Sequence, residues 1–237
     1  MDKNYRPTDD ERIYEDIILA ANHTLIAGCS GSGKSTAENA IIYRALTNGK
    51  PNLFVLIDLK RVELRAYKDI VNTIWYADTI EATRDALEGT LNTIENRFAE
   101  MQKLGLKKTR EADIYVIIDE YADMVLMDKS LERYVQRISQ IGRAAGVHLI
   151  ICTQRPCSEV ISGAVKVNLE TRLALRTMTA QDSRNIIGIS GAEELPRYGY
   201  GILMDCGYHK YTVIEKIDDD RMQRVLNYYH PQKGVNL

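Results

Sequence analysis

The chain has 237 residues, within the range of one large domain, and its hydrophobic content of 45% is enough to bury a sizeable core. Its 31 basic and 33 acidic residues give a formal net charge of -2, which excludes a molecule that is basic over its whole surface. Any nucleic-acid-binding surface must therefore be local.

The cysteines and the apolar segments favour a protein of the reducing cytoplasm. The four cysteines form neither a C-x-x-C pair nor a cluster with histidines at metal-ligand spacing, so free thiols are expected. The polar segment 1–16 lacks the pattern of a secretory signal, and no apolar run approaches the roughly 18 residues of a membrane-spanning helix. We therefore expect a cytoplasmic protein without membrane insertion of its own.

Short apolar runs alternate with longer helical patterns along the chain. The runs predict strands at His23–Ala27, Leu53–Ile57, Tyr115–Ile118, His148–Cys152, Thr171–Leu175, Gly201–Met204 and Tyr211–Ile214. Helices are predicted at Ser35–Asn48, Ile80–Leu104, Leu131–Ala145 and Asp219–Tyr229. This alternation indicates an α/β fold with a mainly parallel sheet flanked by helices. Because no linker or repeat interrupts it, we expect one domain over 1–237, with 1–20 as a lead-in and 230–237 as a tail.

Residues 28–35 read Gly-Cys-Ser-Gly-Ser-Gly-Lys-Ser and fit the phosphate-binding pattern G-x-x-x-x-G-K-[ST] completely. The pattern lies between a predicted strand and a predicted helix, which makes a chance glycine-rich turn a poor alternative. Its glycines let backbone N–H groups approach phosphate oxygens, and the following helix directs its positive end there. Lys34 would bind the β and γ phosphates, and Ser35 would bind Mg²⁺. We therefore predict ATP and Mg²⁺ as cofactors, bound by Gly28, Cys29, Ser30, Gly31, Ser32, Gly33, Lys34, Ser35, Thr36 and, from a later strand, Asp119.

Polar residues also follow two later strands. Asp119 and Glu120 come directly after Ile114–Ile118, at the position of a Walker B element. In that role Asp119 would hold Mg²⁺ and Glu120 would orient the attacking water, whereas a surface turn is the alternative. Gln154 follows His148–Cys152. It would either contact the γ-phosphate or the attacking water, or make only a hydrogen bond at the strand end.

Arg143 lies at the end of a predicted helix, in the segment Gly142–Gly146. An arginine at a helix C-terminus complements the helix dipole, and this is the role that the sequence alone favours. The other reading is a guanidinium that enters the nucleotide site of a neighbouring subunit and stabilises transition-state charge there.

Taken in order, these segments resemble the motor domain of the FtsK/SpoIIIE DNA translocases. The resemblance covers roughly residues 20–215, and its one small departure in the core motifs is Leu59 in place of a usual proline. The matching segments are Asn22–Gly28 with Gly31–Ser35, Ile57–Lys60 with Glu63-Leu64, Asp119–Asp123, Arg143–Leu149 with Thr153–Pro156, Asp182–Arg184, and Gly191–Glu193.

The resemblance implies a RecA-like P-loop ATPase that is stimulated by DNA and moves double-stranded DNA through a homo-oligomeric ring, expected to be a hexamer. It also implies that Gln154 is a sensor and that Arg143 acts in a neighbouring subunit. The expected catalytic residues are then Lys34, Glu120, Gln154 and Arg143. Loops that face DNA in the family correspond to Arg155 and Arg184, which become the expected DNA contacts.

Some family features differ or are not found in the sequence. Ala180 stands where many members carry a lysine, and Ile202 where an aspartate is common, which weakens the expected DNA contacts. Because we find no membrane segments, linker or winged-helix domain, we expect a minimal motor from a conjugation, phage or plasmid context. A relaxase, a recombinase or a membrane protein are candidate partners. The alternatives are a type VII secretion-like ATPase that acts on polypeptide and a module that uses ATP only for assembly.

Overall fold

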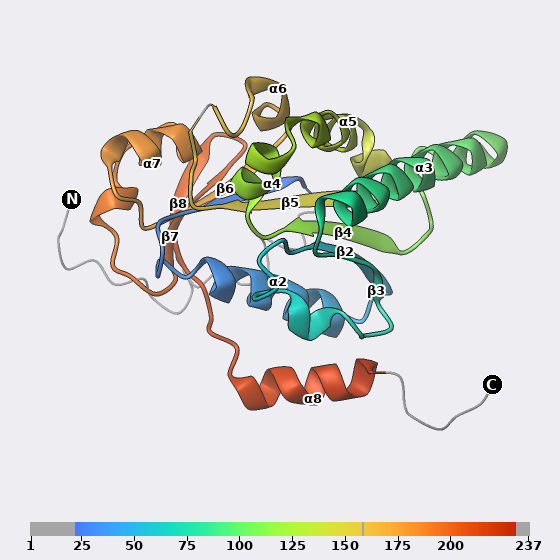
Figure 1. Cartoon of the computed structure of the whole chain (residues 1–237), viewed down its shortest axis with the longest axis horizontal. Helices are drawn as coiled ribbons and strands as arrows, with labels where there is room; N and C mark the ends of the chain where they lie inside the picture. Colours follow the sequence, from blue (N-terminus) through green and yellow to red (C-terminus); the bar gives the residue numbers. More distant parts are fainter. Residues whose placement is uncertain (1–21, 158, 231–237) are drawn as a thin grey trace.

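The computed structural model describes residues 22–157 and 159–230, so the expected lead-in and nearly all of the expected tail lie outside the described residues. An eight-stranded sheet in the order β3-β2-β4-β5-β1-β6-β7-β8 runs through the centre (Figure 1). The strands from β3 to β6 in this order are parallel, and β7 and β8 extend the sheet in antiparallel fashion. The strands are β1 (Thr24–Ala27), β2 (Asn52–Ile57), β3 (Thr73–Ala77), β4 (Asp113–Ile118), β5 (Val147–Thr153), β6 (Thr171–Leu175), β7 (Tyr200–Asp205) and β8 (Tyr208–Val213). The predicted fold class is confirmed.

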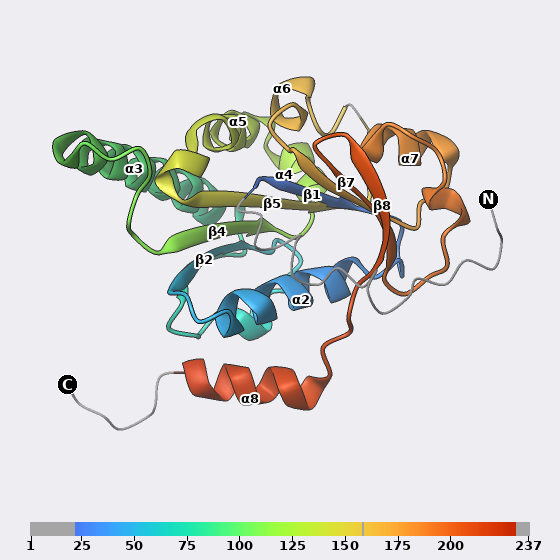
Figure 2. The ribbon, with the colours of Figure 1, turned by 180° about the vertical axis from the view of Figure 1, so that it is seen from behind.

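Helices cover both faces of this sheet (Figures 1 and 2). On one face lies α2 (Lys34–Thr47), and α8 (Asp219–Tyr229) packs against α2 from outside. The other face carries α3 (Ile80–Leu104), α4 (Tyr121–Met127), α5 (Glu132–Ile141), α6 (Gly163–Lys166) and α7 (Ala180–Ile187). Short 3-10 turns occur at Arg65–Tyr67, Lys129–Leu131, Arg143–Ala145 and Ala192–Glu194. Each face of the sheet therefore has its own apolar core.

Burial on both faces explains the continuous apolar runs of the inner strands. All seven residues of β5 are buried, as are all four of β1. The long helix α3 begins where the Thr79 side chain accepts a hydrogen bond from the Ala82 N–H (3.1 Å), and it ends at Gly105 with φ of 66°. None of the helices in the described ranges is both long and apolar enough to cross a bilayer.

The structure differs from the predicted elements chiefly in two respects. The helix predicted at Leu131–Ala145 is wrong as one unit, because α5 is flanked by a 3-10 turn on each side. Strand β3 and helices α4, α6 and α7 were not predicted. The edge strand β3 exposes Ile74 and Trp75, so it lacks the buried apolar run that identifies an inner strand.

The parallel strands place several loops at one edge of the sheet. The phosphate loop follows β1, Asp119 follows β4 and Gln154 follows β5, so all three lie at the carboxyl ends of neighbouring strands. Arg143 precedes β5 and therefore lies at the opposite edge. The candidate site forms at the edge where β1, β4 and β5 end, not at the edge of Arg143.

Candidate nucleotide-binding site

The phosphate loop is a close-packed turn between β1 and α2. Gly31 and Gly33 have φ values of 73° and 107°, in the region that favours glycine. A side chain at Gly33 would also place its Cβ 2.5 Å from the Gly199 nitrogen. Behind the loop, Ser32 is fully buried. The backbone therefore favours glycine at Gly33, which the motif prescribes, and also at Gly31, a position that the motif leaves open.

Helix α2 starts directly at the end of this loop and leaves its first N–H groups available. The Ala37 N–H donates to the Gly33 carbonyl (3.0 Å), and no described side chain caps the helix. The N–H groups of the preceding residues, Lys34, Ser35 and Thr36, then need another acceptor. A phosphate group bound at the loop would provide it and would also face the positive end of the helix dipole.

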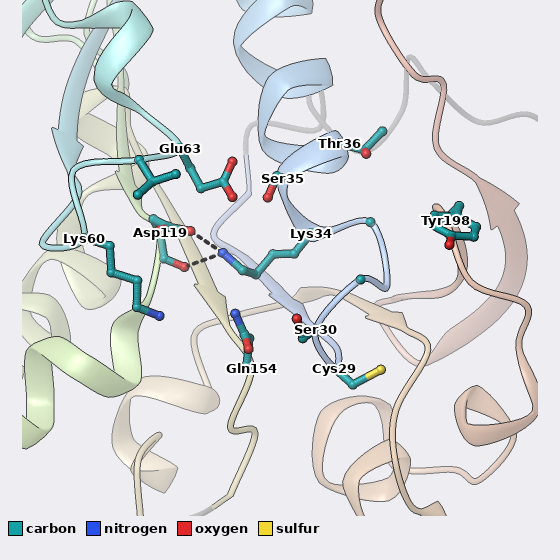
Figure 3. A pocket seen from close by; sticks show the side chains of 13 residues that line it. Cys29, Ser30, Lys34, Ser35, Thr36, Lys60, Glu63, Asp119, Gln154 and Tyr198 are labelled. Atoms are coloured by element: carbon teal, nitrogen blue, oxygen red, sulfur yellow. Dashed lines mark hydrogen bonds and ion pairs between the residues drawn. The ribbon is translucent and has the colours of Figure 1, made fainter.

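A cavity of about 370 Å³ opens above the loop (Figure 3). This volume falls within the roughly 300–1,000 Å³ that is usual for small-molecule sites. The lining residues come from the phosphate loop and from the ends of three neighbouring strands, with one further loop. They are Cys29, Ser30, Gly31, Gly33, Lys34, Ser35, Thr36, Lys60, Val62, Glu63, Asp119, Gln154 and Tyr198. Two predicted loop residues, Gly28 and Ser32, do not line the cavity, and Ser32 is fully buried.

Lys34 is buried among carboxylates at the centre of the cavity. Its ammonium group lies 3.0 Å from the Asp119 carbonyl and forms an ion pair with the Asp119 carboxylate (Figure 3). A second carboxylate, from Glu38, lies 3.4 Å away. Burial alone lowers the pKa of Lys34, but the carboxylates, with Glu38 foremost, raise that pKa above its usual value. Lys34 therefore remains charged, and the carboxylates take the place that phosphate oxygens would have.

Glu38 is the feature of this site that the motif does not prescribe. It is almost fully buried on α2, and burial raises its pKa well above the usual value of about 4.5, although the charge of Lys34 opposes the rise. Lys34 therefore favours the ionised form of this carboxyl group, whereas burial favours the protonated form.

Glu120 is held at the edge of the cavity by the end of β5. The Thr153 hydroxyl donates to Glu120 Oε1 (2.7 Å), and the Gln154 backbone N–H donates to the same oxygen (3.1 Å). Lys60 lies 3.8 Å from the other carboxylate oxygen and pairs more closely with Asp123 at 3.1 Å. Neighbouring strands therefore fix the predicted catalytic carboxylate, while the Gln154 side chain lines the cavity itself.

The three arginines predicted from the sequence do not line this cavity. Arg143, in the turn before β5, donates to Glu170 at 2.6 Å, and both side chains are partly exposed. Arg155 is exposed after β5, and Arg184 is exposed on α7. Neither Arg155 nor Arg184 forms an ion pair with another residue of the described ranges. By contrast, Lys166 is half-buried and donates to the Asn185 carbonyl.

Four cavity residues were not predicted to take part: Lys60, Val62, Glu63 and Tyr198. Lys60 and Glu63 belong to a segment that resembles a family motif, so the sequence marked these residues but did not indicate what they do. Tyr198 carried no signal in the sequence. No group of three His, Cys, Asp or Glu residues within 22–157 and 159–230 is arranged to hold a metal ion.

A phosphate loop between β1 and α2, an acidic residue after β4 and this strand order together define a P-loop NTPase with a RecA-like fold. The model of the FtsK/SpoIIIE family matches residues 4–116 and 107–158. The chain belongs to this family.

Individual relatives agree with the family. The DNA translocase FtsK of Staphylococcus aureus is 37% identical over 239 residues, which cover 90% of this chain and 30% of the relative. That of Chlorobaculum tepidum is 35% identical over 204 residues, covering 76% of this chain and 25% of the relative. This chain therefore spans less than a third of the length of these curated relatives.

Two solved structures share the fold at lower identity. The conjugation coupling protein TcpA of pCW3, with ATPγS, has a TM-score of 0.79 at 21% identity and covers 96% of this chain and 75% of its own. The type VII secretion ATPase EccC of Thermomonospora curvata also has a TM-score of 0.79, at 18% identity, and covers 98% of this chain and 33% of its own. At these identities the likeness shows the fold alone.

Proposed function

We propose that this chain is an ATPase that moves double-stranded DNA through a ring of identical subunits. The observation that carries this proposal is a cavity lined together by the phosphate loop, Asp119 and Gln154, in a chain of the FtsK/SpoIIIE family. The relatives at 34–37% identity are DNA translocases, whereas the likeness to a type VII secretion ATPase is at 18% identity. DNA is therefore favoured over polypeptide as the substrate.

The residues of the cavity fit a nucleoside triphosphate with Mg²⁺. The loop N–H groups and the first turn of α2 bind phosphate oxygens, and Lys34 exchanges its carboxylate partners for the β and γ phosphates. Ser35 and Asp119 hold Mg²⁺, which supplies countercharge for the phosphates when bound. Asp119 is released for this role as Lys34 turns to the phosphates.

The chain positions two further groups for hydrolysis. Glu120 orients the attacking water, and Thr153 and the Gln154 N–H hold its carboxylate in place. The Gln154 side chain, which lines the cavity, contacts the γ-phosphate or the same water. Phosphoryl transfer requires positioning and charge stabilisation more than covalent chemistry. These groups are therefore the contribution that the chain makes to hydrolysis at its own site.

We assign Arg143 to the nucleotide site of a neighbouring subunit. The seven residues of β5 separate Arg143 from its own chain's site, a span of roughly 20 Å, which is longer than an arginine side chain. The pair with Glu170 is partly exposed, so it is weak enough to exchange for a phosphate. This position supports a ring, and a hexamer is the size we propose.

The DNA contacts are assigned to Arg155 and Arg184. Both are exposed and lack an acidic partner within the described ranges, so their guanidinium groups can bind phosphates. A motor that moves along DNA of any sequence contacts the DNA backbone rather than base edges.

The proposal also includes a cytoplasmic location and a mobile-element context, with a relaxase, a recombinase or a membrane protein as the partner.

The test is ATP turnover by the full chain with Mg²⁺, with and without linear duplex DNA. We expect DNA to raise turnover and Glu120→Gln to abolish the increase. If the chain hydrolyses ATP at the same rate with and without DNA, the DNA motor is refuted and the polypeptide-moving alternative is favoured. If it neither binds nor hydrolyses ATP, the ATPase itself is refuted.

A further inference from the structure

Tyr198 is an aromatic residue in an unusual conformation beside the phosphate loop. Its φ is 69°, a left-handed value that is a genuine outlier for a bulky side chain. The residue is also 80% exposed. Strained positions of this kind cost about 1–3 kcal/mol and cluster at ligand-binding sites, so the conformation calls for an explanation.

The neighbouring glycine fixes this conformation. The Gly199 N–H donates to the Ser32 carbonyl (2.9 Å), and the Gly199 carbonyl accepts from the Ile214 N–H (2.8 Å). Gly199 also packs closely on Gly33, because a Cβ added to Gly33 would lie only 2.5 Å from the Gly199 nitrogen. The segment that carries Tyr198 is thus attached to the phosphate loop on one side and to the end of β8 on the other.

Tyr198 lies where a nucleoside would leave the phosphate loop. It lines the same cavity as Lys34 and Asp119 but comes from the other side of the loop, beyond Thr36 (Figure 3). The lysine of a phosphate loop binds the β and γ phosphates, and the loop backbone holds the α and β phosphates. The terminal phosphate therefore lies toward Asp119, and the sugar and base extend past the start of α2 toward Tyr198.

We propose that Tyr198 is the stacking platform for the base of the bound nucleotide. An exposed phenol ring offers a π face to any base, and a ring attached to the phosphate loop is already positioned before the nucleotide arrives. Stacking offsets the backbone strain and the exposure of the ring. The contact favours flat bases without reading their edges. This inference rests on the proposed nucleotide site and deepens it.

The experiment compares a nucleotide with a ligand that has phosphates but no base. Binding of ATPγS and of inorganic tripolyphosphate, each with Mg²⁺, is measured by calorimetry on the full chain. The variants are Tyr198→Ala, Tyr198→Phe and, as a matched control, Tyr208→Ala, which removes a tyrosine that is 84% exposed and does not line the cavity. Thermal unfolding verifies that each variant is folded.

We expect Tyr198→Ala to weaken ATPγS binding by about 5-fold or more and to leave tripolyphosphate binding unchanged. Tyr198→Phe and Tyr208→Ala should bind both ligands as the wild type does. Unchanged ATPγS affinity in Tyr198→Ala overturns the stacking role while the nucleotide site stands. Equal losses for both ligands also overturn it, because the effect then comes from the phosphate loop. If the wild type binds neither ligand, the proposed nucleotide site fails, and the stacking role fails with it.

Discussion

Replacing Lys34 should destabilise the protein even when no nucleotide is present. The Lys34 ammonium group is buried with the carboxylates of Asp119 and Glu38, which are themselves almost fully buried. Lys34→Met keeps a similar side-chain length but leaves both carboxylates without a countercharge. Breaking a buried pair in this way costs about 3–5 kcal/mol. In a chain of this size the midpoint of thermal unfolding should fall by roughly 6–20 °C.

The loss should also depend on pH through Glu38. Burial raises the pKa of Glu38 above its unfolded value of about 4.5, and Lys34 opposes that rise, so Lys34→Met raises the folded-state pKa further. The folded protein then binds a proton that the unfolded chain has already released. Stability accordingly falls as pH rises from about 4.5 through the folded-state pKa. The deficit relative to the wild type should be smaller at pH 5 than at pH 8.

The assay is urea unfolding without nucleotide at both pH values. Lys108→Met, which replaces an exposed lysine, is the matched control and should unfold like the wild type. Adding Glu38→Gln to Lys34→Met should recover part of the loss. If Lys34→Met unfolds within about 0.5 kcal/mol of the wild type at pH 8, the carboxylates do not depend on Lys34 and the reasoning is wrong.

Further predictions concern the roles assigned above. Glu120→Gln should retain ATP binding and lower turnover by about 100-fold or more, measured by phosphate release; normal turnover would remove it from the reaction. Thr153→Val removes the hydroxyl bonded to that carboxylate and should lower the free energy of unfolding in urea by about 1.5–3 kcal/mol, and an unchanged midpoint would contradict this. Arg143→Ala mixed with Glu120→Gln should recover turnover that neither has alone, and no recovery in co-assembled subunits would exclude action between subunits. Arg155→Ala and Arg184→Ala should weaken binding to unrelated DNA sequences and each lower the log–log salt slope by about 0.9, so an unchanged slope would exclude phosphate contact.

The contiguous parts of the site could be predicted from the sequence. Lys34 and Ser35 follow each other on one loop, and Asp119 ends an apolar strand, so their spacing alone indicates the chemistry. The bond from Thr153 to Glu120 could not be predicted, because it depends on the pairing of β4 with β5. Tyr198 enters the cavity only because Gly199 packs on the phosphate loop, a tertiary contact without a local pattern.

The same distinction applies to the fold. Inner strands such as β5 are buried on both faces and have continuous apolar runs, so they were predicted. Strand β8 begins at Tyr208, three residues before the predicted start. The prediction missed these first residues because they are exposed and do not form an apolar run. The hydrophobic pattern of a sequence indicates which residues are buried. Prediction from this pattern therefore fails for an element that lies at the surface.

The central position of β1 affects how the domain folds. Its Thr24 pairs with Ile150 on one side and Thr171 on the other, and both partners come far later in the chain. During synthesis β1 has no neighbouring strand until most of the domain has emerged, and closing such long loops makes folding slow. The phosphate loop also depends on later residues, because the Gly28 N–H donates to the Thr153 carbonyl (3.3 Å) and the Cys29 N–H donates to the Arg176 carbonyl (2.8 Å). A ligand held there therefore stabilises the assembled sheet as a whole, in proportion to the logarithm of its concentration.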